Sequence, residues 1–74
     1  MNKNFSKEDM LSILKWRALV AYKEATNESF VEWMTDLVKN SSKEEYSAHD
    51  VFILMNANAA TTPVGEIKAC IKPA

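Results

Sequence analysis

The sequence predicts an α+β fold in which two or three short helices pack on a small C-terminal β-hairpin. Residues 6–25 and 28–39 place apolar side chains at the three- and four-residue spacing of amphipathic helices. Residues 66–72 instead alternate apolar and charged side chains, which is typical of a strand with one buried face. The same residues leave open an all-α bundle of three to four short helices.

The chain is small and nearly neutral. Its 74 residues carry a net charge of −1, and 47% of them are hydrophobic, which is the composition of a globular protein. We therefore expect a single small domain over residues 1–74, with residues 57–74 as a candidate C-terminal tail. Because there is neither a basic patch nor an apolar run of about 18 residues, we expect no nucleic acid and no membrane as partner, and a cytoplasmic location.

The first predicted helix begins at Ser6 and ends near residue 25. Ser6 and Asp9 have the spacing of a capping box, in which each side chain bonds the backbone N–H of the other residue. Apolar residues surround the middle of this helix on nearly every side. Either the helix is the central element of the fold, or it binds another protein or a second copy of the chain through Trp16, Leu19 and Tyr22.

The second predicted helix, residues 28–39, has the clearest period in the chain. Apolar side chains recur on one face and charged ones on the other. Asn27 is a good N-cap residue for this helix. Trp33 and Met34 lie on the apolar face, so both are expected in the core.

Residues 42–50 predict a short turn of helix, because Ser42 and Glu45 repeat the spacing of a capping box. The apolar run that follows, residues 51–56, is too short for its period to distinguish a strand from a helix. Its assignment therefore depends on the segment with which it pairs.

The C-terminal segment GEIKACIKPA, residues 65–74, has a period of two. As a strand it would pair with residues 51–56, and a slip of one residue would bury both lysines, so the register is strongly specified. Such a strand would expose Cys70 on the lysine face, where thiol reagents reach it. We favour this structure because of the period.

The same segment has the features of a short helix as well. Thr62 would be the N-cap residue and Pro63 the first helical residue, and both positions suit these side chains. A helix would, however, place Gly65 in its first turn and leave Lys68 and Lys72 beside the apolar stripe. This alternative corresponds to the all-α bundle.

Few residues of the chain could carry chemistry. Ser47, His49, Asp50 and Cys70 are types found in nucleophilic sites, but neighbouring His and Asp side chains point apart, and no oxyanion motif accompanies them. One histidine and one cysteine do not form a zinc site, and one glycine does not form a phosphate loop. We therefore expect no enzyme, with no catalytic residue, no metal and no cofactor.

The stretch ALVAYKEATNESFVEWMTDLVKN, followed by SSKEEYSAHDVFILMNAN, resembles the nitrile-hydratase-like leader domains of ribosomally made precursor peptides that enzymes later modify. The matching positions are Asn27, Glu28 and Phe30, the helix through Trp33 and Met34, Lys39 and Asn40, Glu44 to Tyr46, and the apolar runs 51–55 and 67–71. Ser41 and Ser47 depart from the family, which has Pro and Gly there. The resemblance covers about residues 18–72 and implies two helices closed by an apolar strand pair.

Two functions fit these observations. The first is a non-catalytic protein-recognition domain, and its most specific form is a leader-type precursor that a peptide-modifying enzyme binds. Thr61, Thr62 and Cys70 would then be the modification sites, since dehydration and thioether formation use these residue types. The alternative is a small regulator or inhibitor, of the kind that mobile elements encode, that binds a larger host protein.

Overall fold

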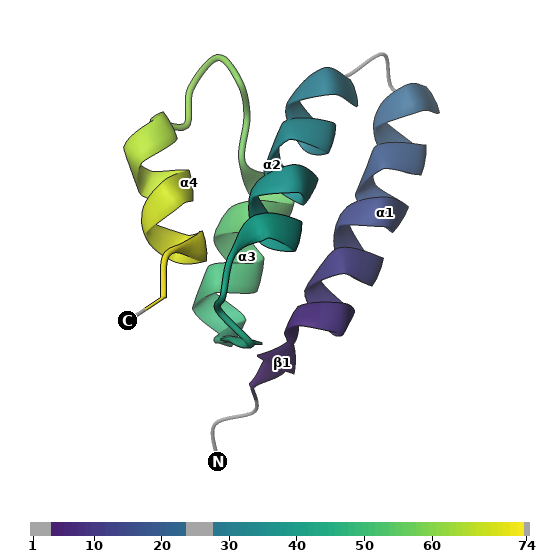
Figure 1. Cartoon of the computed structure of the whole chain (residues 1–74). Coiled ribbons are helices and arrows are strands. Elements are labelled where there is room, and N and C mark those ends of the chain that lie inside the picture. The colour runs from purple at the N-terminus through teal and green to yellow at the C-terminus, as the bar shows by residue number, and fades with distance from the viewer. Residues whose placement is uncertain (1–3, 24–27, 74) are drawn as a thin grey trace.

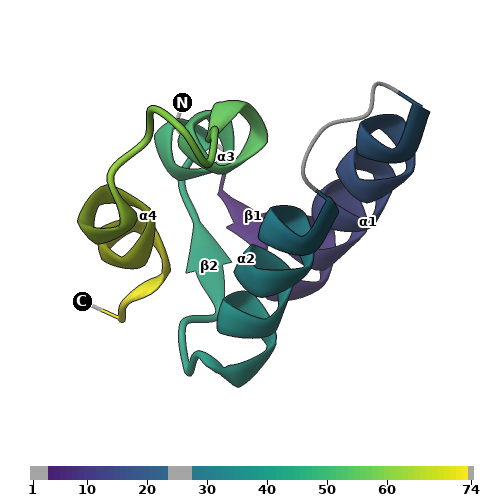
Figure 2. The same ribbon diagram turned by 90° about the horizontal axis from the view of Figure 1, so that it is seen from above.

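The structure, a computed structural model, describes residues 4–23 and 28–73, and the side chains of residues 21–23 and 28 lie outside the described part. The described residues form four helices and two short strands (Figures 1 and 2). The helices are α1 (Lys7–Lys23), α2 (Glu28–Asn40), α3 (Ala48–Asn56) and α4 (Val64–Ile71), and the strands are β1 (Phe5–Ser6) and β2 (Glu45–Tyr46). The fold is therefore mostly helical with a small antiparallel sheet. None of the described helices is both long and apolar enough to cross a membrane.

The predicted pair of N-terminal helices is confirmed. α1 and α2 lie side by side in Figures 1 and 2. The capping box at the start of α1 forms as expected, because the backbone N–H of Asp9 donates to Ser6 Oγ at 3.1 Å and that of Ser6 donates to Asp9 Oδ2 at 3.3 Å. The predicted N-cap residue of α2, Asn27, lies outside the described residues.

The predicted C-terminal hairpin is wrong, because residues 51–56 lie in α3 and residues 65–71 in α4. In α4 the side chains of Ile67, Cys70 and Ile71 are buried, at the helical spacing of three and four. Ile67 and Ile71 are four residues apart, and this spacing fits both the two-residue period of a strand and the period of a helix. Ala69, which completed the alternation, is exposed, and an alanine costs little on a surface.

The turn of helix predicted within residues 42–50 is wrong for residues 45–46, which form β2, whereas residues 48–50 do begin a helix, α3. β2 pairs antiparallel with β1, with Phe5 opposite Tyr46 and Ser6 opposite Glu45. The capping box in this segment is formed by Ser47 and Asp50 at the start of α3. A strand of two residues is too short to show alternation, so the sequence pattern could not reveal it.

The core lies where the four helices and β2 meet. The buried hydrophobic residues are Met10, Leu14, Val31, Met34, Val38, Tyr46, Leu54, Ala57, Ile67, Cys70 and Ile71. Met34 is fully buried, as expected, whereas Trp33 packs against the margin of this core and is half-buried. The ring of Trp33 stacks on that of Phe30, with ring centroids 5.7 Å apart.

Arg17 ties α1 to the end of α3. Its Nη1 donates to the carbonyl oxygen of Leu54 at 2.5 Å, and its Nη2 donates to the carbonyl oxygen of Ala57. Carbonyls at the end of a helix have no partner within the helix, and a cation is favourable there because the helix dipole is negative. Arg17 therefore caps α3 from a neighbouring helix.

The packing of α4 predicts the effect of one truncation. Ile67→Ala is expected to lower the free energy of unfolding by about 2–5 kcal/mol, because a fully buried side chain leaves a cavity. Val64→Ala on the same helix removes a side chain that is 49% exposed, and its effect should stay within about 0.5 kcal/mol. Urea denaturation followed by circular dichroism measures both. Equal effects would show that α4 does not pack as described.

Candidate functional site

The outer face of α1 carries an exposed apolar pair. Trp16 and Leu19 are 59% and 64% exposed, although both are large hydrophobic side chains. They stand three residues apart, so they are neighbours on the helix surface. Met10 and Leu14, on the opposite face, are fully buried. The third residue expected in a binding surface, Tyr22, has its side chain outside the described part.

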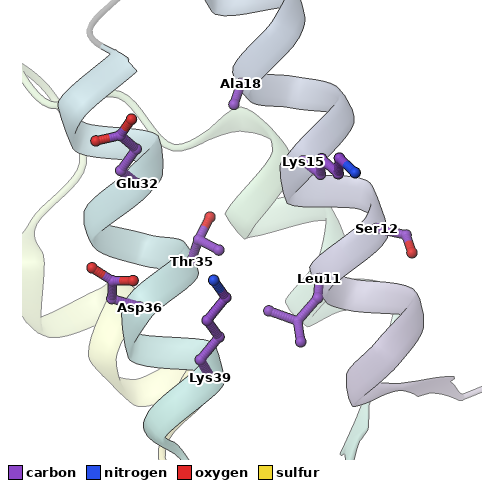
Figure 3. A pocket seen from close by; sticks show the side chains of 8 residues that line it. All are labelled: Leu11, Ser12, Lys15, Ala18, Glu32, Thr35, Asp36 and Lys39. Atoms are coloured by element: carbon purple, nitrogen blue, oxygen red, sulfur yellow. The ribbon is translucent and has the colours of Figure 1, made fainter.

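A groove runs between α1 and α2 beside this face. It encloses about 480 Å³ and is lined by Leu11, Ser12, Lys15, Ala18, Glu32, Thr35, Asp36 and Lys39 (Figure 3). Figure 3 shows the Leu11 side chain directed from α1 toward α2, at the same end of the groove as Lys39, whereas Ala18 and Glu32 lie at the other end. The groove therefore has a mixed wall on α1, where Leu11 and Ala18 alternate with Ser12 and Lys15, and a mostly charged wall on α2.

The charged side chains of the groove have no ionic partner among the described residues. Among the described residues an ion pair joins Lys43 to Asp50, and neither of these two lines the groove. Lys15, Glu32, Asp36 and Lys39 are all exposed, so leaving them unpaired costs little. They are available to charged groups of a partner.

The candidate modification residues Thr61 and Thr62 lie in the connection between α3 and α4. Thr61 is exposed, and the hydroxyl oxygen of Thr62 accepts a hydrogen bond from the backbone N–H of Asn58 at 2.9 Å. Both line a hollow of about 200 Å³ beside Phe52, which is 66% exposed. Both lie at the molecular surface.

Cys70, the third candidate, lies in the core. Its side chain is 6% exposed, so the prediction that Cys70 is accessible on a lysine face is wrong, because the residue belongs to a helix and not to a strand. Burial raises the pKa of the Cys70 thiol, and the negative charge of Asp50 raises it further. The thiol is therefore protonated and shielded in the folded chain.

Lys43 is the centre of a polar cluster between α3, α4 and β2. Its Nζ donates to the carbonyl oxygen of Cys70 at 2.6 Å and to Asp50 Oδ2 at 3.0 Å, and it lies 4.8 Å from the centre of the Tyr46 ring. Ser41 Oγ donates to the carbonyl oxygen of Ile71 at 2.7 Å. The segment before β2 thus caps the last turn of α4.

Ser47 and Asp50, two of the residues considered for a nucleophilic site, instead form the cap at the start of α3. Ser47 Oγ accepts from the backbone N–H of Asp50 at 3.1 Å, and Asp50 Oδ2 accepts from that of Ser47 at 3.1 Å, which makes the capping box of α3. His49 is exposed and takes no part in this capping box. The part of the chain that the structure describes contains no group of three His, Cys, Asp or Glu side chains that could hold a metal ion.

The sequence did not identify the groove or the Lys43 cluster. A groove depends on which faces of two helices meet, and no motif marks it. For the capping by Arg17 a signal was present, since this arginine lies among apolar residues on the inner face of α1. No protein-family model, curated protein or solved structure matches the chain.

The burial of Cys70 predicts slow reaction with a thiol reagent. At neutral pH labelling should be about a hundredfold slower in the folded chain than in urea, because α4 must first leave the core. The variant Ser42→Cys adds an exposed thiol to the same molecule as an internal reference. Rapid labelling of Cys70 in a chain of full helical content would contradict the position of α4.

The Lys43–Asp50 pair predicts a dependence of stability on pH. Burial alone would raise the pKa of Asp50, but hydrogen bonds from Lys43 and Ser47 and the charge of Lys43 lower it below its usual value. The stabilisation is therefore present above the ordinary pKa of an aspartate and is lost as the pH falls from neutral through the lower pKa of the folded state.

Lys43→Met should make this loss of stability shallower, and Lys39→Met, which removes an exposed lysine without an ionic partner among the described residues, should leave its slope unchanged. Urea midpoints measured across this pH range test both variants. Identical slopes for Lys43→Met and the unaltered chain would show that the pair does not control the titration of Asp50.

Proposed function

We propose that the chain is a non-catalytic protein-recognition domain that binds another protein through the outer face of α1. The observation that carries this proposal is the exposure of Trp16 and Leu19 on a helix whose opposite face is fully buried. Small domains bury most of their large apolar side chains, and an exposed pair of this kind is typical of an interaction surface.

The energetics favour Trp16 as the anchor of this contact. A tryptophan side chain offers about 150–250 Å² of surface, so covering its exposed part would contribute about 2–4 kcal/mol. Tryptophan is also enriched among the residues on which protein interfaces depend most. Leu19 extends the apolar area by one helical turn, and the unpaired charges of the groove would give the contact its specificity.

A leader-type precursor peptide is the more specific form of this proposal. In that form a peptide-modifying enzyme binds the face of α1 and acts on the accessible connection that contains Thr61 and Thr62. Cys70 would become a substrate when α4 leaves the core. A small regulator or inhibitor of a larger protein is the alternative, and it differs in the partner and not in the binding face.

The test is recovery of the partner from the native cell with the tagged full chain. Trp16→Glu should abolish recovery, because a charge cannot be buried in an apolar contact. Phe52→Glu is the matched control, since Phe52 is equally exposed but lies on α3, and it should leave recovery unchanged.

The identity of the recovered protein separates the two forms. A peptide-modifying enzyme, together with loss of water at Thr61 or Thr62 by mass spectrometry, would support the leader-type precursor. A partner of another class would support the regulator. Recovery that is insensitive to Trp16→Glu would contradict the proposed face.

A further inference from the structure

We propose that a second copy of this chain covers the outer face of α1 when no other partner is bound, in a parallel two-fold dimer. The inference rests on the proposed function, because it takes the same face as the recognition surface. It commits to one arrangement, in which Trp16 of each copy lies in the α1–α2 groove of the other.

The surface of α1 divides into parallel strips. Residues seven apart lie almost directly above one another on a helix, since seven residues make nearly two turns. Asp9 and Trp16 form one strip, and Leu11 and Ala18 form another that lines the groove. The strip of Ser12 and Leu19 lies between these two.

A two-fold axis parallel to α1 brings the outer strips together. Such an axis places the Asp9–Trp16 strip of one copy against the groove of the other, and the reciprocal contact follows by symmetry. Trp16 then packs against Leu11, Ala18 and the aliphatic stem of Lys15 of the second copy. Ser12 and Leu19 lie nearest the axis, where each faces its own counterpart.

The parallel orientation of the two α1 helices also suits the charges of the groove. In the parallel arrangement Asp9 comes beside Lys39, because Lys39 lines the same end of the groove as Leu11 (Figure 3). An antiparallel two-fold dimer would instead place each strip against its own counterpart, so Trp16 would not enter the groove and Asp9 would not meet Lys39. Neither Asp9 nor Lys39 has an ionic partner among the described residues, so the parallel dimer gains two ion pairs without breaking any.

The size of the contact sets the expected affinity. Each copy contributes two large exposed apolar side chains, Trp16 and Leu19, which places the interface at the small end of specific interfaces, below about 1,200 Å² in total. We therefore expect a dissociation constant in the micromolar range or weaker. The net charge of −1 gives little repulsion between copies. A dimer this weak shields Trp16 and still gives way to a tighter partner.

The test is sedimentation equilibrium of the full chain from about 10 μM to about 1 mM, which brackets the expected dissociation constant. Trp16→Glu should weaken the dimer at least about tenfold, and Phe52→Glu should change it by less than about twofold. A chain that stays monomeric at the highest concentration overturns the inference. If the chain is monomeric but another protein is still recovered through Trp16, the proposed function stands and only the dimer is wrong.

Charge exchange tests the pairing of Asp9 with Lys39. Asp9→Lys and Lys39→Glu should each weaken self-association, by about two- to tenfold. An equimolar mixture of the two variants should recover the affinity of the unaltered chain, because each mixed contact then joins opposite charges. Circular dichroism of each variant controls for folding, since Asp9 also caps α1. A mixture no tighter than the separate variants contradicts the pairing.

Cross-linking tests the direction of the helices. Ser12→Cys should form a disulfide with its counterpart on mild oxidation, because Ser12 lies near the proposed axis. Ser42→Cys, at an exposed position outside the helices, is the matched control and should remain monomeric. A dimer without the Ser12→Cys cross-link would overturn the parallel arrangement. If a dimer forms as described but no other protein is recovered, the inference stands and the proposed function fails.

Discussion

The C-terminal half of the fold depends on the ammonium group of Lys43. This group donates to the carbonyl oxygen of Cys70 in α4 and to Asp50 in the first turn of α3, and it lies over the ring of Tyr46 in β2, so one side chain contacts three elements. The α4 helix has eight residues and no side-chain bond at its N-cap. A helix of that length is not stable in isolation, so its structure follows from its docking.

This dependence explains why the sequence predicted the two halves unequally. The first two helices are long enough for a period to be visible, and the Ser6–Asp9 spacing marks the start of one of them, so local patterns were sufficient. The C-terminal segment offers two isoleucines that suit a strand and a helix equally well. The helix contacts the core and a lysine more than twenty residues away, and no local pattern contains those contacts.

The candidate site was predictable to a similar degree. A helix with more apolar surface than the core can cover must expose some of it, and Trp16 and Leu19 were identified on that ground. The groove beside them was not predictable, because its walls come from two helices whose relative rotation is set by packing. Cys70 was predicted to be exposed because its segment was predicted to be a strand, and it is buried because the segment is a helix.

The bond between Arg17 and the end of α3 has a mechanical consequence. Arg17 follows directly after Trp16, and the carbonyls that it holds, those of Leu54 and Ala57, directly precede the connection to α4. If a ligand rotated α1 about its own axis, either the end of α3 would move with it or both hydrogen bonds from Arg17 would break. The helix that exposes Trp16 and Leu19 is thus joined by hydrogen bonds to the chain just before the connection that contains Thr61 and Thr62.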